Sequence, residues 1–247
     1  MAVYPLKINR YPVRAGKGRL RAVHLTDLHL DDAADLSWLR RLVERINREE
    51  PDMIFFSGDL ATRQHPYRTA ADAVAILREM EAPLGKFAVR GNHDVYGAAG
   101  QAPALIQDAG FVLLQNEVAS ARTADGRPVW IGGLDTARYR LENADVRRVL
   151  PLRARRDALR ILLMHEPQVA QRVPVGTADL MLAGHTHQGQ FHVPGVERLW
   201  LPPLTGRYVH GFYTVHHMPL YVSAGLGESG PRVRFCAPRE AVIFDFV

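Results

Sequence analysis

The sequence predicts an α/β fold in which two mixed β-sheets pack as a sandwich with helices outside them. Between residues 21 and 133, short apolar runs alternate with amphipathic stretches, as strands alternate with helices in layered α/β proteins. From residue 191 onward, Gly, Pro and short alternating runs are frequent, which is typical of antiparallel strands closing a second sheet. No repeat or linker divides the chain, so we expect a single domain over residues 1–247.

The first predicted strands are two apolar runs that each end in an aspartate. They are RAVHLTD at 21–27 and MIFFSGD at 53–59. Between them, Asp35 stands at the expected cap of a helix. The apolar face of this helix is marked by Leu36, Leu39, Val43 and Ile46.

The middle of the chain continues the alternation. The spacing predicts a second helix over 69–81, then a turn over 82–85 and a strand over 87–90. A third helix is expected over 102–109, ending at Gly110 because glycine readily adopts the conformation that terminates helices.

Further strands follow the third helix. They are predicted at 111–114, 117–122, 128–133, 159–165 and 178–185. The second and third of these should form a hairpin across Asp125-Gly126. The basic stretch 147–160 is expected to be a connecting helix whose arginines form a solvated face.

Charge and cysteine content limit the chemistry. The net charge of +5 rests on arginine, since only three of the 31 basic residues are lysines. The guanidinium fork suits phosphate oxygens, although a simple surface bias explains the excess equally well. One cysteine, Cys236, excludes an internal disulfide and a thiolate zinc cluster, so any metal must be held by nitrogen and oxygen.

The opening residues show no signal-peptide core, and no apolar run approaches the roughly 18 residues that a membrane span needs. We therefore expect a cytoplasmic or peripheral membrane location. Whether a longer natural precursor carries an anchor is left open.

Five segments place a polar, metal-capable residue just after an apolar run. They are 26–29, 57–59, 90–94, 164–166 and 183–187. In open α/β sheets, ligands bind in the crevice at the carboxyl ends of the strands, so residues that follow different strands come together there. Together the segments offer two carboxylates, an amide oxygen and four imidazoles: Asp27, His29, Asp59, Asn92, His165, His185 and His187.

The spacing within these segments favours two metal ions. Residues two apart in an extended segment point the same way, so Asp27 with His29 and His185 with His187 can act as pincers. Seven ligands exceed one tetrahedral site and suit two ions that share one carboxylate, for which Asp59 is the natural bridge. The mixed shell suits divalent ions, manganese first, with iron, zinc, magnesium or calcium as alternatives.

In order, the segments read D-x-H, G-D, G-N-H-D, H and G-H-x-H, a pattern that resembles the calcineurin-like metallophosphoesterase superfamily. The resemblance implies a β-sandwich flanked by helices. It assigns one ion to Asp27, His29, Asp59 and His187, and the other to Asp59, Asn92, His165 and His185. It also makes His93 the catalytic histidine, oriented by Asp94.

The carboxy-terminal third, from GHTHQGQF at 184–191 to PREAVIFDF at 238–246, resembles the bacterial phosphodiesterase-like subgroup. Members of that subgroup often carry an amino-terminal membrane segment, and some hydrolyse phospholipid-like or UDP-diacylglucosamine substrates. This chain departs from them in lacking that segment and in having Gln188 where glycine is usual. The resemblance implies a small-molecule or lipid phosphoester substrate.

These observations favour a phosphodiesterase in which two cations hold a hydroxide for attack and His93 protonates the leaving group. A pyrophosphatase acting on a UDP-diacylglucosamine-type or other lipid substrate, and a catalytically silent metal-binding scaffold, remain alternatives. A nuclease is a further rival, although nucleic acid is not the expected partner.

Several residues outside the motifs are secondary candidates. Arg90 and Tyr96 could contact phosphate, and His24 could support the site from the core. The stretch Trp200–Leu204 suits either a hydrophobic leaving group or sheet packing.

Overall fold

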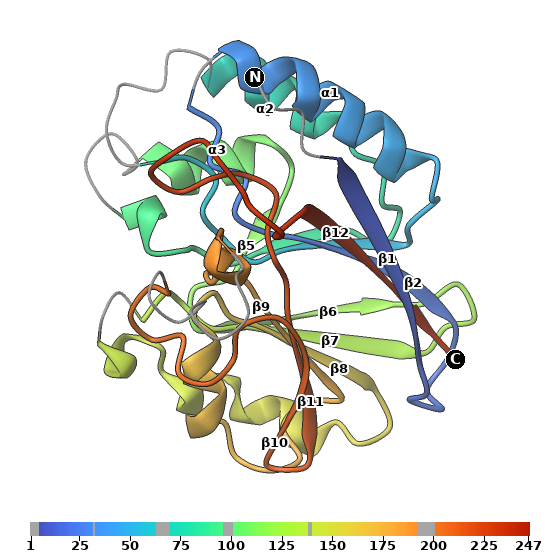
Figure 1. Ribbon diagram of the computed structural model, residues 1–247. Helices are drawn as coiled ribbons and strands as arrows, with labels where there is room; N and C mark the ends of the chain where they lie inside the picture. The colour runs from blue at the N-terminus through green and yellow to red at the C-terminus, as the bar shows by residue number, and fades with distance from the viewer. Residues whose placement is uncertain (1–4, 32, 63–69, 96–100, 138–139, 192–200) are drawn as a thin grey trace.

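The computed structural model describes residues 5–31, 33–62, 70–95, 101–137, 140–191 and 201–247. Two six-stranded mixed sheets are stacked on each other, as expected. Three α-helices cover the outer face of the first sheet: α1 (Ala33–Asn47), α2 (Ala70–Arg78) and α3 (Ala102–Asp108) (Figure 1).

The first sheet has the order β1-β12-β2-β3-β4-β5. Its strands are β1 (Leu6–Val13), β12 (Arg239–Phe246), β2 (Leu20–Leu25), β3 (Met53–Phe56), β4 (Lys86–Ala88) and β5 (Val112–Leu113). From β2 to β5 all neighbours are parallel, while β12 runs antiparallel to β2 and parallel to β1. The carboxyl ends of β2, β3 and β4 therefore lie at one edge of the sheet.

The second sheet has the order β10-β11-β9-β8-β7-β6. Its strands are β10 (Gly211–Val215), β11 (Met218–Val222), β9 (Leu180–Ala183), β8 (Leu159–Leu163), β7 (Pro128–Gly133) and β6 (Glu117–Arg122). The four central strands are parallel, and the two outer pairs are antiparallel hairpins. The hairpin predicted across Asp125-Gly126 is the β6–β7 pair.

Short 3-10 helices lie in the connections between strands. One of them, η1 (His93–Val95), follows β4 of the first sheet. The others lie in the second half of the chain: η3 (Leu141–Asn143), η4 (Val146–Ala154), η5 (Pro167–Arg172) and η6 (His187–Gly189). Val149 and Leu152 of η4 pack with Leu162 of β8 in one hydrophobic cluster.

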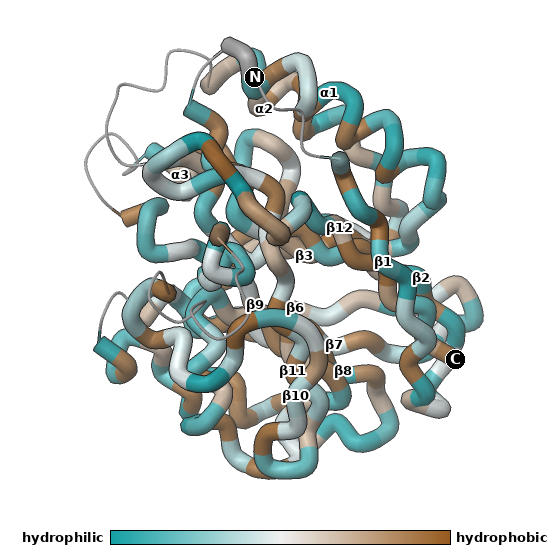
Figure 2. The backbone as a smooth tube through the Cα atoms, in the orientation of Figure 1, coloured by the Kyte–Doolittle hydropathy of each residue, from teal (hydrophilic) through white to brown (hydrophobic). Residues whose placement is uncertain are grey.

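Alternation along the strands builds a layer of core on each side of the first sheet. Val23 and Leu25 of β2 pack toward the helices, together with Val43 of α1. Ala22 of β2 instead joins Phe55, in the cluster that fills the space between the sheets. Figure 2 shows hydrophobic residues concentrated along the strands, whereas α1 alternates hydrophobic and hydrophilic stretches.

Several element predictions need correction. Strand β12 lies in the first sheet instead of the second, because it is buried on both faces between β1 and β2. The expected helix over 147–160 is only the 3-10 helix η4, which contains Pro151, and the chain then leads into β8. Asp35 lies within the first turn of α1, where its carboxylate accepts from the N–H of Asp31.

Strand β1 was not predicted, and the predicted helix start at Thr69 lies outside the described residues. In the described parts of the chain, every helix is too short or too polar to span a membrane.

Candidate metal centre

The five predicted segments meet where the carboxyl edges of the two sheets face each other. Asp27, Asp59 and Asn92 follow β2, β3 and β4, while His165 and His185 follow β8 and β9. The N–H of His185 donates to Asp27 Oδ2 at 3.0 Å, which ties a loop of the second sheet to the first. The fold thus brings residues that are 158 positions apart into contact.

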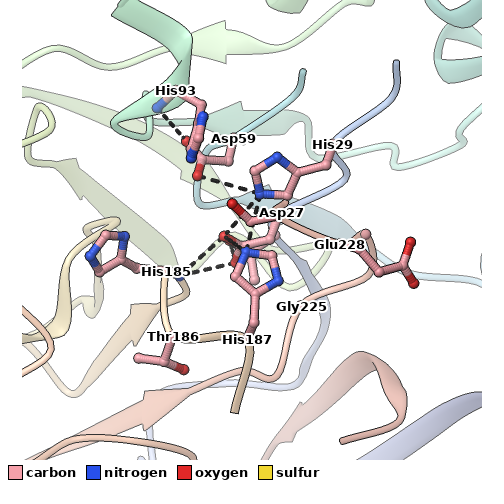
Figure 3. Close-up of polar contacts among 12 residues, drawn as sticks. Asp27, His29, Asp59, His93, His185, Thr186, His187, Gly225 and Glu228 are labelled. Atoms are coloured by element: carbon pink, nitrogen blue, oxygen red, sulfur yellow. Dashed lines mark hydrogen bonds and ion pairs between the residues drawn. The ribbon is translucent and has the colours of Figure 1, made fainter. Parts of the chain in front are cut away.

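The first group of donor atoms comes from Asp27, His29, Asp59 and His187 (Figure 3). The Nε2 atoms of His29 and His187 lie 3.1 Å apart. Asp27 Oδ1 lies 3.4 Å from Nε2 of His187, and Asp59 Oδ2 lies 3.6 Å from Nε2 of His29.

The second group comes from Asp59, Asn92, His165 and His185. Nε2 of His165 lies 3.2 Å from Asn92 Oδ1, from Asp59 Oδ2 and from Nδ1 of His185. Asp59 Oδ2 therefore lies close to an imidazole nitrogen of each group.

These distances fit divalent cations. Two imidazole nitrogens that face each other at 3.1 or 3.2 Å repel through their lone pairs unless a proton or a cation lies between them. With metal–ligand bonds of about 2.0–2.2 Å, neighbouring ligand atoms come to lie about 3 Å apart. The buried carboxylates of Asp27 and Asp59 also require positive charge nearby.

Outer hydrogen bonds orient three of the four imidazoles. Nδ1 of His165 donates to the Ser57 carbonyl at 2.7 Å, and Nε2 of His185 donates to the Pro203 carbonyl at 2.7 Å. Nδ1 of His29 lies 3.2 Å from the Thr62 hydroxyl, which can accept from it. Each bond leaves the other ring nitrogen free to face the centre with its lone pair. The fourth imidazole, His187, instead faces Arg234.

Burial sets the protonation states of the donors. It lowers the pKa of His29 to about 3, with Asp59 opposing the shift. Burial, assisted by the Arg234 guanidinium, holds the pKa of His187 well below its usual range. Burial alone would raise the pKa of Asp59, but the adjacent His165 holds it well below the usual range. Burial alone would lower the pKa of His165, but the Asp59 carboxylate raises it well above its ordinary value, so a bound cation has to displace the proton of this imidazole. Neutral imidazoles and an ionised carboxylate are the forms that bind cations.

His93 lies at the rim of the centre. Its backbone N–H donates to Asp59 Oδ1 at 2.8 Å, and its ring meets that of His29 edge-on, with 5.0 Å between centroids. Within the described residues, Nδ1 of His93 has no hydrogen-bond partner. One ring nitrogen of His93 lies within 4.8 Å of a donor atom of His29 and of Asp59, so the ring is close to the donor groups.

The hydrogen bonds of Asp94 differ from the expected one, because among the described residues its carboxylate bonds to backbone N–H groups and Nδ1 of His93 has no partner. Its carboxylate accepts from the N–H groups of Asp59, Leu60 and Gly91 at 2.8–2.9 Å. Burial and the Asp59 charge raise the pKa of Asp94 to about 7. These three bonds tie the loop that follows β3 to the loop that follows β4.

A cleft of about 210 Å³ opens beside the donor groups. Its lining comprises Asp59, Asn92, His93, His185, Thr186, His187, Gly189, Gln190, Phe191, Pro202, Ser229 and Pro231. No lysine or arginine belongs to this lining as far as the structure describes it. The cleft walls are thus apolar or neutral, while its floor carries the histidines and Asp59.

The secondary candidates have varied positions. Arg90 forms a two-point ion pair with Asp135, with Nε 2.8 Å from Oδ1, so its guanidinium is already paired. His24 is buried and its Nε2 lies 2.8 Å from the Ser57 hydroxyl, in the residue whose carbonyl holds His165. Tyr96 and Trp200 lie outside the described residues.

Two residues of the site were missed by the sequence reasoning. Gln190 fixes the cleft wall, because its side chain donates to the Pro231 carbonyl at 2.8 Å and accepts from the Ser229 N–H at 3.0 Å. Arg234 has a side chain that is 0% exposed, and its Nη2 lies 3.2 Å from Nδ1 of His187. In the sequence, the only sign that Arg234 is buried is the position of this charged residue between the apolar residues Val233 and Phe235.

Comparison with known proteins, like the clustered donor atoms, indicates a metal-dependent phosphoesterase. Residues 20–189 match the family model of the calcineurin-like phosphoesterases. The chain is 33% identical, over 226 residues, to the uncharacterized metallophosphoesterase YkuE of Bacillus subtilis. The aligned region covers 91% of this chain and 78% of YkuE.

Two solved structures from Thermus thermophilus share the fold at low identity. TT1561 has a TM-score of 0.56 with 14% identity, over 84% of this chain and 90% of that one. A 5'-nucleotidase precursor has a TM-score of 0.55 with 16% identity, over 84% of this chain and 49% of that one, so this chain spans about half its length. The family match over most of the chain, together with the clustered Asp and His donors, shows that this protein belongs to the calcineurin-like phosphoesterase family, whose members are metal-dependent phosphoester hydrolases.

Proposed function

We propose that this protein is a two-metal phosphodiesterase, with manganese as the first candidate for both ions. One ion would be held by Asp27, His29, Asp59 and His187, and the other by Asp59, Asn92, His165 and His185. The observation that carries this proposal is the pair of donor groups that share Asp59 Oδ2, each with imidazole nitrogens facing one another at 3.1 or 3.2 Å.

When bound, the two ions would neutralise phosphate charge and activate a water molecule for attack on phosphorus. The leaving alkoxide needs a proton, and His93 is the group at the rim of the centre that can supply it. The bond from the His93 backbone N–H to Asp59 Oδ1 holds the backbone of this residue beside the shared carboxylate. Asp94 keeps that geometry by binding both loops from below.

The cleft favours a diester over a monoester. A monoester carries a second negative charge, and no described residue of the cleft lining is a lysine or arginine that could meet it. A diester instead has a second organic arm, for which Phe191, Pro202 and Pro231 provide an apolar wall.

A lipid-type pyrophosphate such as UDP-diacylglucosamine is the second candidate substrate. Beyond the cleft wall, Val233 and Phe235 are 45% and 55% exposed, and Phe235 pairs by a β-bridge with Phe191 of the cleft. Exposed apolar side chains next to a cleft suit an apolar substrate portion.

The test is a comparison of three substrates with manganese-loaded protein: bis(p-nitrophenyl) phosphate, p-nitrophenyl phosphate and UDP-diacylglucosamine. We expect about two ions per chain by mass spectrometry and a kcat/KM at least about tenfold higher for the diester than for the monoester. The Asp59→Asn variant is the control, because it removes the shared carboxylate. Fewer than about one ion per chain together with no hydrolysis would overturn the two-metal proposal, and a preference for the monoester would overturn the diester assignment.

A further inference from the structure

The ring nitrogen of His187 that faces away from the metal centre, here called its outer nitrogen, has a positively charged neighbour. The outer nitrogens of the other three histidines face oxygen atoms instead. His29, His165 and His185 each point their outer nitrogen at an oxygen that can accept a hydrogen bond. His187 points its outer nitrogen at the guanidinium of Arg234, at 3.2 Å. One of the two donor groups therefore has a positive charge directly behind it.

Arg234 is held rigidly in this position. Its Nε donates to the Gly227 carbonyl at 3.0 Å, and its Nη1 donates to the carbonyls of Ala224 at 2.9 Å and Ala237 at 3.3 Å. With a side chain that is 0% exposed, it cannot turn toward solvent.

The charge of Arg234 is only partly balanced. Glu228 Oε1 lies 3.7 Å from Nε of Arg234. The same carboxylate accepts from Arg239 at 3.0 and 3.1 Å, so two guanidinium groups share it. In Figure 3 the Glu228 carboxylate points away from the metal donors, so it is not one of them.

This asymmetry has a physical consequence for metal binding. An acceptor behind an imidazole raises the electron density that the ring offers to a cation, whereas a positive charge behind it lowers that density. The guanidinium also repels the cation directly, since both are positive, and this repulsion is strong because dielectric screening is weak in a buried site. Asp27 gives the first group one more negative charge than the second group, which has the neutral Asn92 in its place. Both effects of Arg234 oppose the extra attraction for a cation that this charge provides.

We propose that Arg234 is a positioning residue that acts through His187 to weaken the binding of the cation held by Asp27, His29, Asp59 and His187. That cation is then more readily exchanged than its ligand charges alone would make it. The inference rests on the proposed two-metal function and adds to it an unequal control of the two ions.

The experiment measures Mn²⁺ affinity without turnover, in the full chain carrying Asn92→Ala, so that the position backed by Arg234 can be titrated alone. Free Mn²⁺ is followed by electron paramagnetic resonance. We expect Arg234→Gln, which keeps N–H donors for the loop carbonyls but removes the charge, to tighten binding on the order of tenfold. Arg234→Lys keeps the charge and should not tighten it.

A second variant carries the opposite prediction. Glu228→Gln removes the carboxylate that balances Arg234, so Mn²⁺ binding should weaken on the order of tenfold. The matched control is Arg232→Gln in the same loop, whose guanidinium faces Asp35 at 2.8 Å, and it should change the affinity by less than about threefold.

Opposite directions for Arg234→Gln and Glu228→Gln support the inference. A merely structural role for this loop would weaken binding in both variants, and that result, or no change in either, overturns it. If Arg234→Gln does not fold, Glu228→Gln decides alone, and unchanged or tighter binding there overturns the inference. A parent chain with Asn92 intact that binds no Mn²⁺ would instead defeat the proposed function.

Discussion

Five of the seven proposed ligands have a left-handed backbone. Asp27, His29, Asp59, His185 and His187 all have φ between 44° and 75°, a region that residues other than glycine seldom adopt. Each such residue costs on the order of 1 kcal/mol or more, which surrounding contacts must offset. Glycine would relieve this backbone strain but would offer no donor atom for a metal. Strain at these positions therefore agrees with a functional site.

His93 offers the clearest test of chemistry at a single residue. His93→Asn keeps the backbone N–H that binds Asp59 but removes the group that can protonate a leaving oxygen. We expect the loss of about 10² to 10⁴ in kcat for a diester with a poor leaving group, and a much smaller loss for a p-nitrophenyl ester. Steady-state kinetics on both esters, with metal content measured alongside, separate the cases. Equal losses on the two esters would contradict the general-acid role.

Among the elements, the strands that position the centre could be predicted from the sequence because they are buried on both faces. Strands β3 and β9 are continuous apolar runs, and β8 is interrupted only by Arg160. A metal-capable residue follows each strand closely, so each strand and its proposed ligand are visible together. By contrast, β1 has only partly buried or exposed residues, and no apolar run distinguishes it. The place of β12 depends on pairing with β1 and β2, which lie more than 200 residues away in the chain.

The same limit applies to the support of the ligands. The sequence spacing predicted the seven proposed donors, but Arg234 and Gln190 make contacts with loops that only the fold brings together. Glycines in the loops after the strands allow backbone conformations or close approaches that other residues would not. Gly58 has a φ of +98°, whereas Gly91 and Gly184 are needed for close approach, since a side chain there would overlap Asp59 or Asp27.

The loop after β9 can be tested through Gly184. In Gly184→Ala the added methyl group would collide with the Thr26 hydroxyl and Asp27 Oδ2. We expect destabilisation of about 1–3 kcal/mol and loss of the ion that Asp27 is proposed to hold, measured by urea unfolding and metal analysis. Gly176→Ala is the control, because its φ of +73° strains the backbone while the space around it is open. Retention of both ions in Gly184→Ala would contradict this explanation.

At the scale of the whole molecule, a buried carboxylate joins the two sheets. Glu240 on β12 of the first sheet accepts from the hydroxyl of Tyr221 on β11 of the second, at 2.7 Å. It also accepts from the Ala224 N–H at 2.8 Å, from Nε2 of His210 at 3.1 Å and from the side chain of Asn9 on β1. A buried charge is tolerated here because so many donors surround it.

This network makes stability depend on pH in a defined window. Burial alone would raise the pKa of Glu240, but the hydrogen bonds from His210, Ala224 and Tyr221 outweigh it and lower the pKa from 4.5 to about 2. Between these values the unfolded chain binds a proton that the folded chain does not. The stabilisation, on the order of 3 kcal/mol, is therefore complete above the unfolded pKa and is lost as the pH falls toward about 2.

Glu240→Gln tests this linkage. The variant has no carboxylate to protonate, so it should be less stable than the wild type near neutral pH and should lose less free energy of unfolding on acidification. Urea unfolding of both proteins in the presence of a chelator, from about pH 7 down to about pH 3, excludes effects of metal loss, since neither protein then carries ions. Parallel curves for the two proteins would contradict the role of Glu240. A wild-type curve that falls more steeply below about pH 4.5 would show that the junction between the sheets depends on an ionised Glu240.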